Sequence, residues 1–495
     1  MTFEAAGPHE KARFFELIPV PVEYNSGLEE RTESMDGRFN PFTIRRTPFM
    51  IYEVLQPIKN ILTASSTVMA AAFRCKIEVT NNSCHMWELR ISHQKVTRIL
   101  RFEVEVFDVE VPPADNKQHK YVNWIFLDEI ASSHHLKTWS LEWEAMVEKY
   151  FCLAHYARQN MVCLWPKFYF DMDEKGRPSI NENKLDTLIK LADRAGIYWL
   201  QGGTIAERKD GEWEASDAVI SLNKDPFPGE GEKTLHIIAA SLYDYLHRKG
   251  IAKRWIQSFF DEPLDVSGKI YRLGTDIIRR AMPGVLIVEA TKARDAIVGT
   301  LDIWCPTVNK YELYQDFFDM RRRAGDHIWV YTCLEPTGNY CNRLLDMERL
   351  RKVWLGWAPA KYLVEGFLHW GGNWTAFRSP FTQSTVPQGD DFGFEFDFSN
   401  KQQLPAGDHV ISYPGYLQPL SCTRLEAQRI GLEDLCILQK LKEKEPEMVK
   451  EIVDTVFRGY ADYEKDVPRY RTAKRKLLSA AYAAGNNQPA ERKKE

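Results

Sequence analysis

The sequence lacks the features that mark membrane and secreted proteins. None of its 495 residues lies in an unbroken apolar run of about eighteen, the length that a helix needs to cross a bilayer. Residues 1–16 include Glu4, Glu10 and Lys11 and lack the basic-then-apolar order of a signal peptide. We therefore expect a cytoplasmic protein with no membrane partner.

An excess of positive charge is also missing. Lys and Arg number 65 and Asp and Glu number 69, which leaves a net charge of −4. A surface with this balance has no positive field to hold a phosphate backbone. We expect no nucleic-acid partner.

Motifs for metal binding and for nucleophilic or phosphate chemistry are absent as well. The nine cysteines include no CxxC pair and several lie in apolar segments, so we interpret them as buried free thiols. His134 and His135 are adjacent and cannot reach one metal ion from a regular element. No HExxH, GxSxG or Walker sequence occurs. We expect no metal ion and no cofactor.

What the sequence does have is ample material for hydrophobic cores. Hydrophobic residues make up 44% and aromatic residues 12% of the chain, and its length allows roughly two to four domains. From about Phe15 to Pro113 apolar and polar side chains alternate with period two, most strictly at 102–106, which predicts a β-sandwich that we assign to residues 1–113. Pro112 and Pro113 break the pattern, and we interpret residues 114–119 as a linker.

A different pattern begins after the linker. Short apolar runs alternate with amphipathic segments of helical length, and the runs are residues 124–127, 162–165, 197–200, 255–260, 285–288, 302–305, 328–331 and 366–370. Eight strands over about 250 residues predict a (β/α)8 TIM-type barrel, which we assign to residues 120–420. An open doubly wound sheet is the alternative, but residues 128–132 lack the glycine-rich turn that would follow its first strand.

Helices are predicted between these strands and after the barrel. Within the barrel they are residues 143–160, 184–195, 234–249, 271–280, 311–324 and 347–357. Residues 421–495 form the C-terminal part, with helices at 424–443 and 447–463 and a polar tail after Gly485 that we expect to fray.

Two adjacent carboxylates follow the fourth predicted strand, in Phe259-Phe260-Asp261-Glu262-Pro263. Chemistry in such barrels lies at the carboxyl ends of the strands, so the pair has a catalytic position. Like charges held close together raise the pKa of one of them, which is the environment of a general acid. Neighbours on a regular strand point to opposite faces, so both reach one site only if the strand ends there, as Pro263 allows. The other interpretation is a loop or a helix start.

Further polar and aromatic residues fall at or near the predicted strand ends. Aromatic rings there could stack on the faces of sugars, and core packing is the alternative for each. They are Trp199, Trp304, Tyr331, Trp370 and Trp374. His369 and Asn373, beside two glycines, could bind hydroxyl groups. Glu335 follows the seventh strand and is another carboxylate at a rim position.

Ordered motifs at residues 260–263, 329–333, 366–373, 407–415 and 424–434 resemble those of glycoside hydrolase family 123 and its relatives (domain of unknown function 4091). The resemblance covers about residues 120–440. It implies a β-sandwich followed by a β/α barrel, and exo-acting, retaining hydrolysis of N-acetyl-β-galactosaminides, with a carbohydrate as substrate. In that chemistry the acetamido oxygen of the substrate attacks the anomeric carbon. By the same resemblance, Glu262 would be the acid/base and Asp261 would hold the acetamido N–H group.

Two other interpretations remain open. In the first, Glu262 is the acid/base and Glu335 is the nucleophile of a retaining glycosidase that acts on another sugar. In the second, the protein binds sugars without hydrolysing them, and Asp261 and Glu262 only accept hydrogen bonds from hydroxyl groups. Release of nitrophenol from a panel of aryl glycosides separates hydrolysis from binding.

Overall fold

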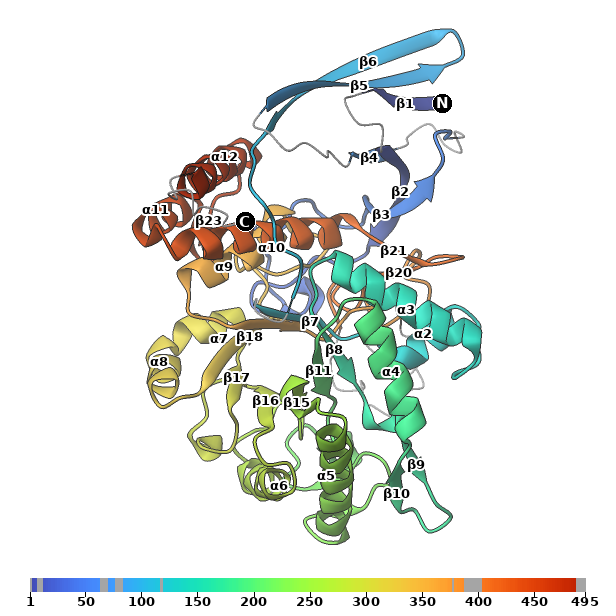
Figure 1. Cartoon of the computed structure of the whole chain (residues 1–495), viewed down its shortest axis with the longest axis vertical. Coiled ribbons are helices and arrows are strands. Elements are labelled where there is room, and N and C mark those ends of the chain that lie inside the picture. The colour runs from blue at the N-terminus through green and yellow to red at the C-terminus, as the bar shows by residue number, and fades with distance from the viewer. Residues whose placement is uncertain are drawn as a thin grey trace, which may run out of the picture.

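The computed structural model describes residues 2–6, 12–62, 70–75, 83–115, 119–375, 378–386 and 403–486. Its centre is a sheet of eight parallel strands surrounded by helices (Figure 1). The strands are β7 (Lys120–Asn123), β8 (Met161–Leu164), β11 (Trp199–Gly202), β15 (Trp255–Gln257), β16 (Leu286–Ala290), β17 (Ile303–Cys305), β18 (His327–Tyr331) and β19 (Gly366–His369). They pair in the order β7-β19-β18-β17-β16-β15-β11-β8, which follows the chain around a ring. The predicted barrel is confirmed.

Side-chain amides close the ring between β7 and β8. Among the described residues no backbone ladder joins these two strands. Asn160 Oδ1 accepts a hydrogen bond from the Tyr121 N–H at 2.9 Å, and Gln159 Oε1 accepts one from the Asn123 N–H at 2.9 Å. Gln159 Nε2 also donates to the Asn123 carbonyl at 3.1 Å. Both amides are buried, so they satisfy strand backbone groups that would otherwise lack partners.

Helices cover the outside of the ring. They are α2 (Leu127–Ser133), α3 (Leu141–Tyr156), α4 (Glu182–Arg194), α5 (Glu230–Arg248), α6 (Gly268–Ala281), α7 (Val308–Leu313), α8 (Gln315–Arg323) and α9 (Leu350–Lys361). A short hairpin, β9 (Phe170–Met172) and β10 (Pro178–Ile180), precedes α4. Ser140 and Asn181 cap α3 and α4 by accepting from backbone N–H groups of the first turn, which fixes where these helices begin.

The predicted position of the first strand is wrong. Residues 124–127 lie after β7, in a loop and at the start of α2. The Phe126 backbone is held there by the side chain of Asn373 and not by a neighbouring strand. The helix predicted at 311–324 is also interrupted, because Tyr314 separates α7 from α8.

The described part of the N-terminal module is rich in β-strands, as predicted, and contains two three-stranded antiparallel sheets. One consists of β1 (Thr2–Ala6), β5 (Ser83–His93) and β6 (Val96–Val106), and the other of β2 (Ala12–Val22), β3 (Phe49–Ile58) and β4 (Ala71–Cys75). The one-turn helix α1 (Glu33–Asp36) lies between β2 and β3. Phe73 of β4 contacts Phe102 of β6 with ring centroids 5.5 Å apart.

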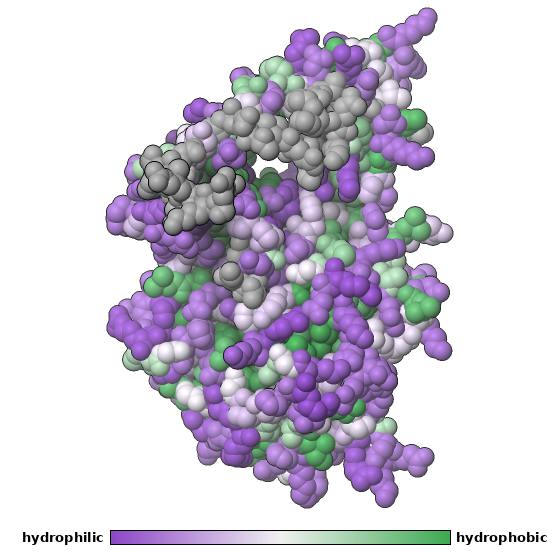
Figure 2. Space-filling view, in the orientation of Figure 1, coloured by the Kyte–Doolittle hydropathy of each residue, from purple (hydrophilic) through white to green (hydrophobic). Residues whose placement is uncertain are grey.

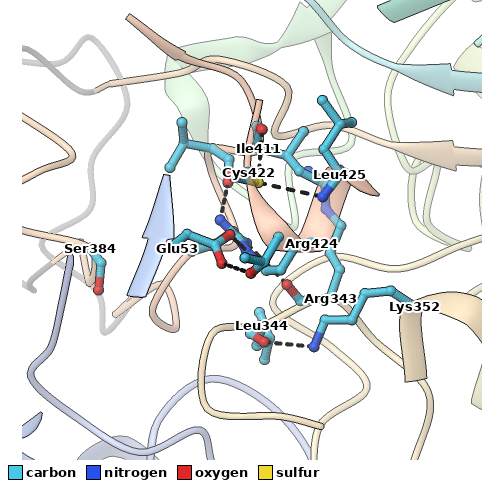
Figure 3. Close-up of polar contacts among 12 residues, drawn as sticks. Glu53, Arg343, Leu344, Lys352, Ser384, Ile411, Cys422, Arg424 and Leu425 are labelled. Carbon is cyan, nitrogen blue, oxygen red and sulfur yellow. Dashed lines mark hydrogen bonds and ion pairs between the residues drawn. The ribbon is translucent and has the colours of Figure 1, made fainter. Parts of the chain in front are cut away.

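A buried ion pair joins this module to the rest of the chain (Figure 3). Glu53 of β3 is fully buried, and its carboxylate accepts from Arg424 Nε at 2.6 Å and from Arg349 Nη2 at 3.0 Å. Burial alone would raise the pKa of Glu53, but the two guanidinium groups lower it to about 2. Arg424 also donates to the carbonyls of Arg343 and Val410, at 3.0 and 2.7 Å. The module is therefore held against the loops that follow β18 and β19.

Between the barrel and residue 486, where the described part of the chain ends, three helices follow, which confirms the prediction of C-terminal helices. They are α10 (Thr423–Lys442), α11 (Pro446–Val456) and α12 (Val467–Asn486), and the hairpin β20 (Tyr413–Pro414) and β21 (Pro419–Leu420) precedes them. α10 lies along α9, where a Cβ on Gly356 would come within 2.3 Å of the Gly431 carbonyl carbon, so only glycine permits this approach.

The helix predicted at 447–463 is too long. It ends at Val456, and the chain continues as the hairpin β22 (Phe457–Gly459) and β23 (Asp462–Tyr463). Phe457 and Gly459 are buried while Arg458 is exposed, so this segment follows the period of a strand.

The visible surface is mostly polar, and the described cysteines form no disulfide. The face in Figure 2 is largely hydrophilic, with hydrophobic residues in scattered patches. Within the described part of the chain, no helix combines the length and apolarity needed to cross a membrane. The described cysteine side chains are all free, as expected, and six of them are buried: Cys163, Cys305, Cys333, Cys341, Cys422 and Cys436. Cys84 and Cys152 are exposed, so the prediction of buried thiols is wrong for these two.

Candidate active site

The backbone turns sharply where the two adjacent carboxylates lie. β15 ends at Gln257, and Phe260 then forms an isolated parallel bridge to Ala206. Glu262 adopts a left-handed conformation with φ of 46°. Such a residue interrupts the alternation of a strand, which allows neighbouring side chains to share one side. It costs a non-glycine residue roughly 1–2 kcal/mol, and strain of this kind collects at functional sites.

The surroundings of the pair favour a protonated Glu262. Burial, and then the charge of Asp261, raise the pKa of Glu262 to about 7. Tyr331 Oη donates to Glu262 Oε1 at 2.6 Å, which opposes this rise by stabilising the ionised form. Burial also raises the pKa of Asp261, while the positive charge of Arg208 lowers it. The arrangement combines one group that can give a proton near neutral pH with a carboxyl beside a cation.

Arg208 is a site residue that the sequence did not reveal. It ends β12 (Ala206–Arg208), which lies in an insertion between β11 and α5 and pairs with β13 (Ala218–Ile220). β13 in turn pairs with β14 (Pro226–Phe227). Arg208 Nη2 donates to the Glu262 carbonyl at 2.8 Å. Its guanidinium lies 3.9 Å from the centre of the Trp213 ring and 5.1 Å from that of Phe260. Burial between these groups lowers the pKa of Arg208.

Glu289 is a second residue that the sequence analysis missed, although it directly follows the apolar run 285–288. It lies in β16 with 2% of its surface exposed. Its Oε1 accepts hydrogen bonds from the N–H groups of Phe259 and Phe260, at 2.5 and 3.0 Å. Burial raises the pKa of Glu289 well above that of a free glutamate.

Glu335 lies on the same rim, beyond the end of β18. Burial, and next the charge of Glu262, raise the pKa of Glu335, so the two carboxyl groups are close enough to interact. Lys310 and Lys292 oppose the rise. No group of three or more His, Cys, Asp or Glu side chains in the described ranges is arranged to hold a metal ion.

Aromatic side chains form a wall over the ends of β19, β7 and β8. Trp370 and Trp374 lie with ring centroids 5.5 Å apart, and Trp370 Nε1 donates to Asp408 Oδ2 at 3.1 Å. Phe126 links Trp370 to Trp165, which the sequence analysis did not single out. Trp165 follows β8 directly, so its position after an apolar run was the available signal. Half-buried rings such as Trp370 and Trp374 can stack on a ligand.

Two of the predicted rim aromatics lie elsewhere. Trp304 is fully buried, its ring packs 5.2 Å from that of Phe317 in α8, and its Nε1 donates to Asp326 at 2.7 Å. It faces the helices because its neighbours Ile303 and Cys305 face the barrel interior. Trp199 is the first residue of β11, and Lys120, the first residue of β7, lies 4.7 Å from its ring. It therefore belongs to the opposite end of the barrel.

The two residues predicted to bind hydroxyl groups, His369 and Asn373, form hydrogen bonds within the protein instead. His369 is fully buried, and its Nδ1 accepts from the Gly371 N–H at 3.0 Å. Asn373 Oδ1 accepts from the Phe126 N–H at 2.7 Å, and its Nδ2 donates to the Phe126 carbonyl at 3.1 Å. Asn373 thus supports the rim, and with 2% of its surface exposed it is placed for this structural role and not for contact with a sugar hydroxyl. Among the predicted residues, Asp261, Glu262, Tyr331, Glu335, Trp370 and Trp374 do share the rim.

Truncation of the two tryptophans should separate core from rim. Trp304→Ala should lower the free energy of unfolding by about 3 kcal/mol or more, because it removes a fully buried ring. Trp370→Ala should cost less stability and weaken substrate binding, since its ring is half-buried at the rim. Denaturant melts and KM values measure both effects. A weaker substrate affinity for Trp304→Ala with unchanged stability would contradict the placement.

Comparison with known proteins gives a family and a fold. Residues 197–441 match the family model described as glycoside hydrolase 123, catalytic domain. A family 123 glycoside hydrolase from Clostridium perfringens, studied for glycolipid glycan hydrolysis, aligns with a TM-score of 0.69 at 13% identity and covers 98% of this chain and 89% of its own. A β-glucuronidase from Parabacteroides merdae aligns with a TM-score of 0.34 at 10% identity and covers 84% of this chain and 49% of its own. No curated protein matches the chain.

The barrel and the match to a catalytic domain define the class of this protein, which is a glycoside hydrolase with a carbohydrate as substrate. The clostridial structure, at 13% identity, adds the same fold over nearly the whole chain. The segment 197–441 thus belongs to the catalytic domain of glycoside hydrolase family 123, the family that the sequence motifs predicted.

Proposed function

We propose that the protein removes terminal β-linked N-acetyl-hexosamine residues of the N-acetylgalactosamine type, with retention of configuration and with assistance from the substrate. The observation that supports this most is the adjacent pair Asp261 and Glu262, which lies just beyond the end of β15 and in which the pKa of Glu262 is raised to about 7. Adjacent carboxyls suit a reaction in which the enzyme supplies no nucleophile.

Glu262 acts as the acid and then as the base in this proposal. In its protonated form it gives its proton to the glycosidic oxygen while the bond from that oxygen to the anomeric carbon breaks. The resulting carboxylate is stabilised by the hydrogen bond from Tyr331 Oη. It then takes a proton from the water that attacks the anomeric carbon, so one water molecule is consumed per bond cleaved.

Asp261 positions the acetamido group of the substrate, whose oxygen is the nucleophile in this proposal. The acetamido oxygen forms a bond to the anomeric carbon as the leaving group departs, and positive charge develops on the ring that results. A carboxylate that accepts the acetamido N–H orients this group and stabilises the charge. Arg208 lowers the pKa of Asp261 and thereby favours its ionised form.

A second candidate is a retaining glycosidase that acts on a sugar without the acetamido group. Glu335 would then attack the anomeric carbon, and Glu262 would be the acid/base. The electrostatic interaction between Glu335 and Glu262 supports placing the two carboxyls in one site.

A panel of 4-nitrophenyl glycosides tests these proposals. We expect kcat/KM for the N-acetyl-β-galactosaminide to exceed that for the β-galactoside by about 10²-fold or more, because only the former carries an intramolecular nucleophile. Proton NMR should show the β-anomer of the released sugar first. Comparable rates on both substrates would favour Glu335 as nucleophile, and no release from any glycoside would favour sugar binding without hydrolysis. The clostridial enzyme was studied for the hydrolysis of glycolipid glycans, so these glycans are the next substrates to test.

A further inference from the structure

We propose that Glu289 is a positioning residue that holds the backbone before Asp261 and Glu262 in its turned conformation. The inference rests on the proposed function, because it concerns the same acid pair. One carboxyl oxygen, Oε1 of Glu289, accepts from two successive backbone N–H groups, those of Phe259 and Phe260. Glu289 lies on the adjacent strand β16, whose backbone pairing with β15 ends at Gln257 and Ile287. Its side chain therefore continues the connection between the two strands beyond the last backbone pair.

Two successive N–H groups directed at one atom are incompatible with a regular strand. In a strand, neighbouring N–H groups point in opposite directions, so this arrangement shows that residues 259–260 have left strand geometry. The opposite side of the segment is held as well. The Phe259 carbonyl accepts from the N–H groups of Ile205 and Ala206, at 3.0 and 2.9 Å. The peptide between Phe259 and Phe260 is therefore held on one side by Glu289 of the barrel strand β16 and on the other by residues 205–206, which follow β11 and begin the insertion.

The left-handed turn at Glu262 needs such support. Its φ of 46° is unfavourable for a residue with a side chain, and it persists only where the surrounding contacts over-determine it. Glu262 itself is held through its carbonyl by Arg208 and through its carboxyl by Tyr331. Glu289 fixes Phe259 and Phe260, the two residues before the pair. The backbone is therefore held both before the pair and at Glu262, which sets the directions of the two carboxyl side chains.

Glu289 is suited to this role as a neutral acid. It is buried, and the groups that interact with its charge are Asp261, Tyr271, Cys305 and Arg208. An uncharged carboxyl still offers a carbonyl oxygen to both N–H groups and adds no negative charge beside Asp261. A glutamine side chain offers the same oxygen, so the residue's acceptor and not its charge should matter.

Three substitutions test the acceptor. Glu289→Gln should keep kcat within about threefold of the parent, since it retains the oxygen. Glu289→Met, of similar length but without an acceptor, should lower kcat by roughly 10²-fold with little change in KM, because small displacements of a catalytic group cost about this much. Glu289→Asp withdraws the carboxyl by one methylene and should lower kcat in the same direction. Asp434→Leu is the control. Asp434 is a buried acid of α10, outside the candidate site, and accepts hydrogen bonds from Trp357 and Tyr470, so this variant shows the effect of removing a buried acid elsewhere in the protein.

Amide hydrogen exchange supplies a readout that does not depend on activity. In Glu289→Met the amides of Phe259 and Phe260 should exchange at least about tenfold faster, while Glu289→Gln should protect them as the parent does. Parent-like kcat and exchange in a folded Glu289→Met, or in Glu289→Asp if the Met variant does not fold, would overturn the proposal. Equal damage from Gln and Met would also overturn it. If the parent hydrolyses no glycoside, the proposed function fails, and the exchange measurement still decides whether Glu289 holds the segment.

Discussion

Glu262→Gln should lower the turnover of glycosides with poor leaving groups by about 10²- to 10⁴-fold, the usual range for general acid–base catalysis. Gln has nearly the size of Glu and can still accept the hydrogen bond from Tyr331 Oη. It has no proton to give to the leaving oxygen. Nitrophenyl leaving groups need less protonation, so their release should fall less. Steady-state kcat/KM on paired alkyl and nitrophenyl glycosides measures the difference.

The pH profile should carry a second signature of Glu262. Its pKa is raised to about 7, so the parent should lose kcat/KM as the pH rises through this value and the acid form disappears. The Gln variant should lack this alkaline limb, because its side chain does not titrate. Glu182→Gln, which removes a surface carboxylate of α4 paired with Arg248, is the matched control and should behave as the parent. Parent-like turnover of alkyl glycosides by Glu262→Gln would exclude Glu262 as the acid.

The barrel could be predicted because its strands are short apolar runs separated by helical segments. Parallel strands buried on both faces read this way in any sequence. The first strand is the exception for a physical reason. β7 begins with Lys120 and ends with the buried Asn123, whereas the more apolar residues 124–127 form the rim and the start of α2. The closing amides of Gln159 and Asn160 could not be foreseen, since they depend on which strands meet.

The site could be predicted only in part. The acid pair could be predicted because two carboxylates after an apolar run are conspicuous. The direction of Trp304 could not, because all residues of the segment 303–305 are apolar. Nothing in that sequence says whether Trp304 or its neighbours face the barrel interior, and a shift of one residue exchanges the two faces. Arg208 comes from an insertion whose fold is set by tertiary contacts. Asn373 looks like a ligand-binding residue until its partner, the Phe126 backbone, is known.

Asp261→Asn should impair hydrolysis of N-acetyl-hexosaminides strongly, by about 10²-fold or more in kcat, under the proposed mechanism. An amide in place of the carboxylate can present its oxygen to the acetamido N–H, but it carries no charge to stabilise the cyclic intermediate. It should also change the acid, because the charge of Asp261 helps to raise the pKa of Glu262. The alkaline limb of kcat/KM should therefore move to lower pH in this variant.

Glu335→Gln provides the contrast that decides between the two mechanisms. Substrate assistance requires no protein nucleophile, so this variant should keep most of its activity, and a thiazoline that mimics the cyclic intermediate should inhibit the parent about 10²-fold more strongly than the substrate binds. If Glu335 is the nucleophile, Glu335→Gln should abolish turnover. A 2-fluoro glycoside should then leave a covalent adduct on Glu335, detectable by intact mass. An adduct on Glu335 without thiazoline inhibition would replace the proposed mechanism by the second one, in which the interaction between Glu262 and Glu335 is that of acid and nucleophile.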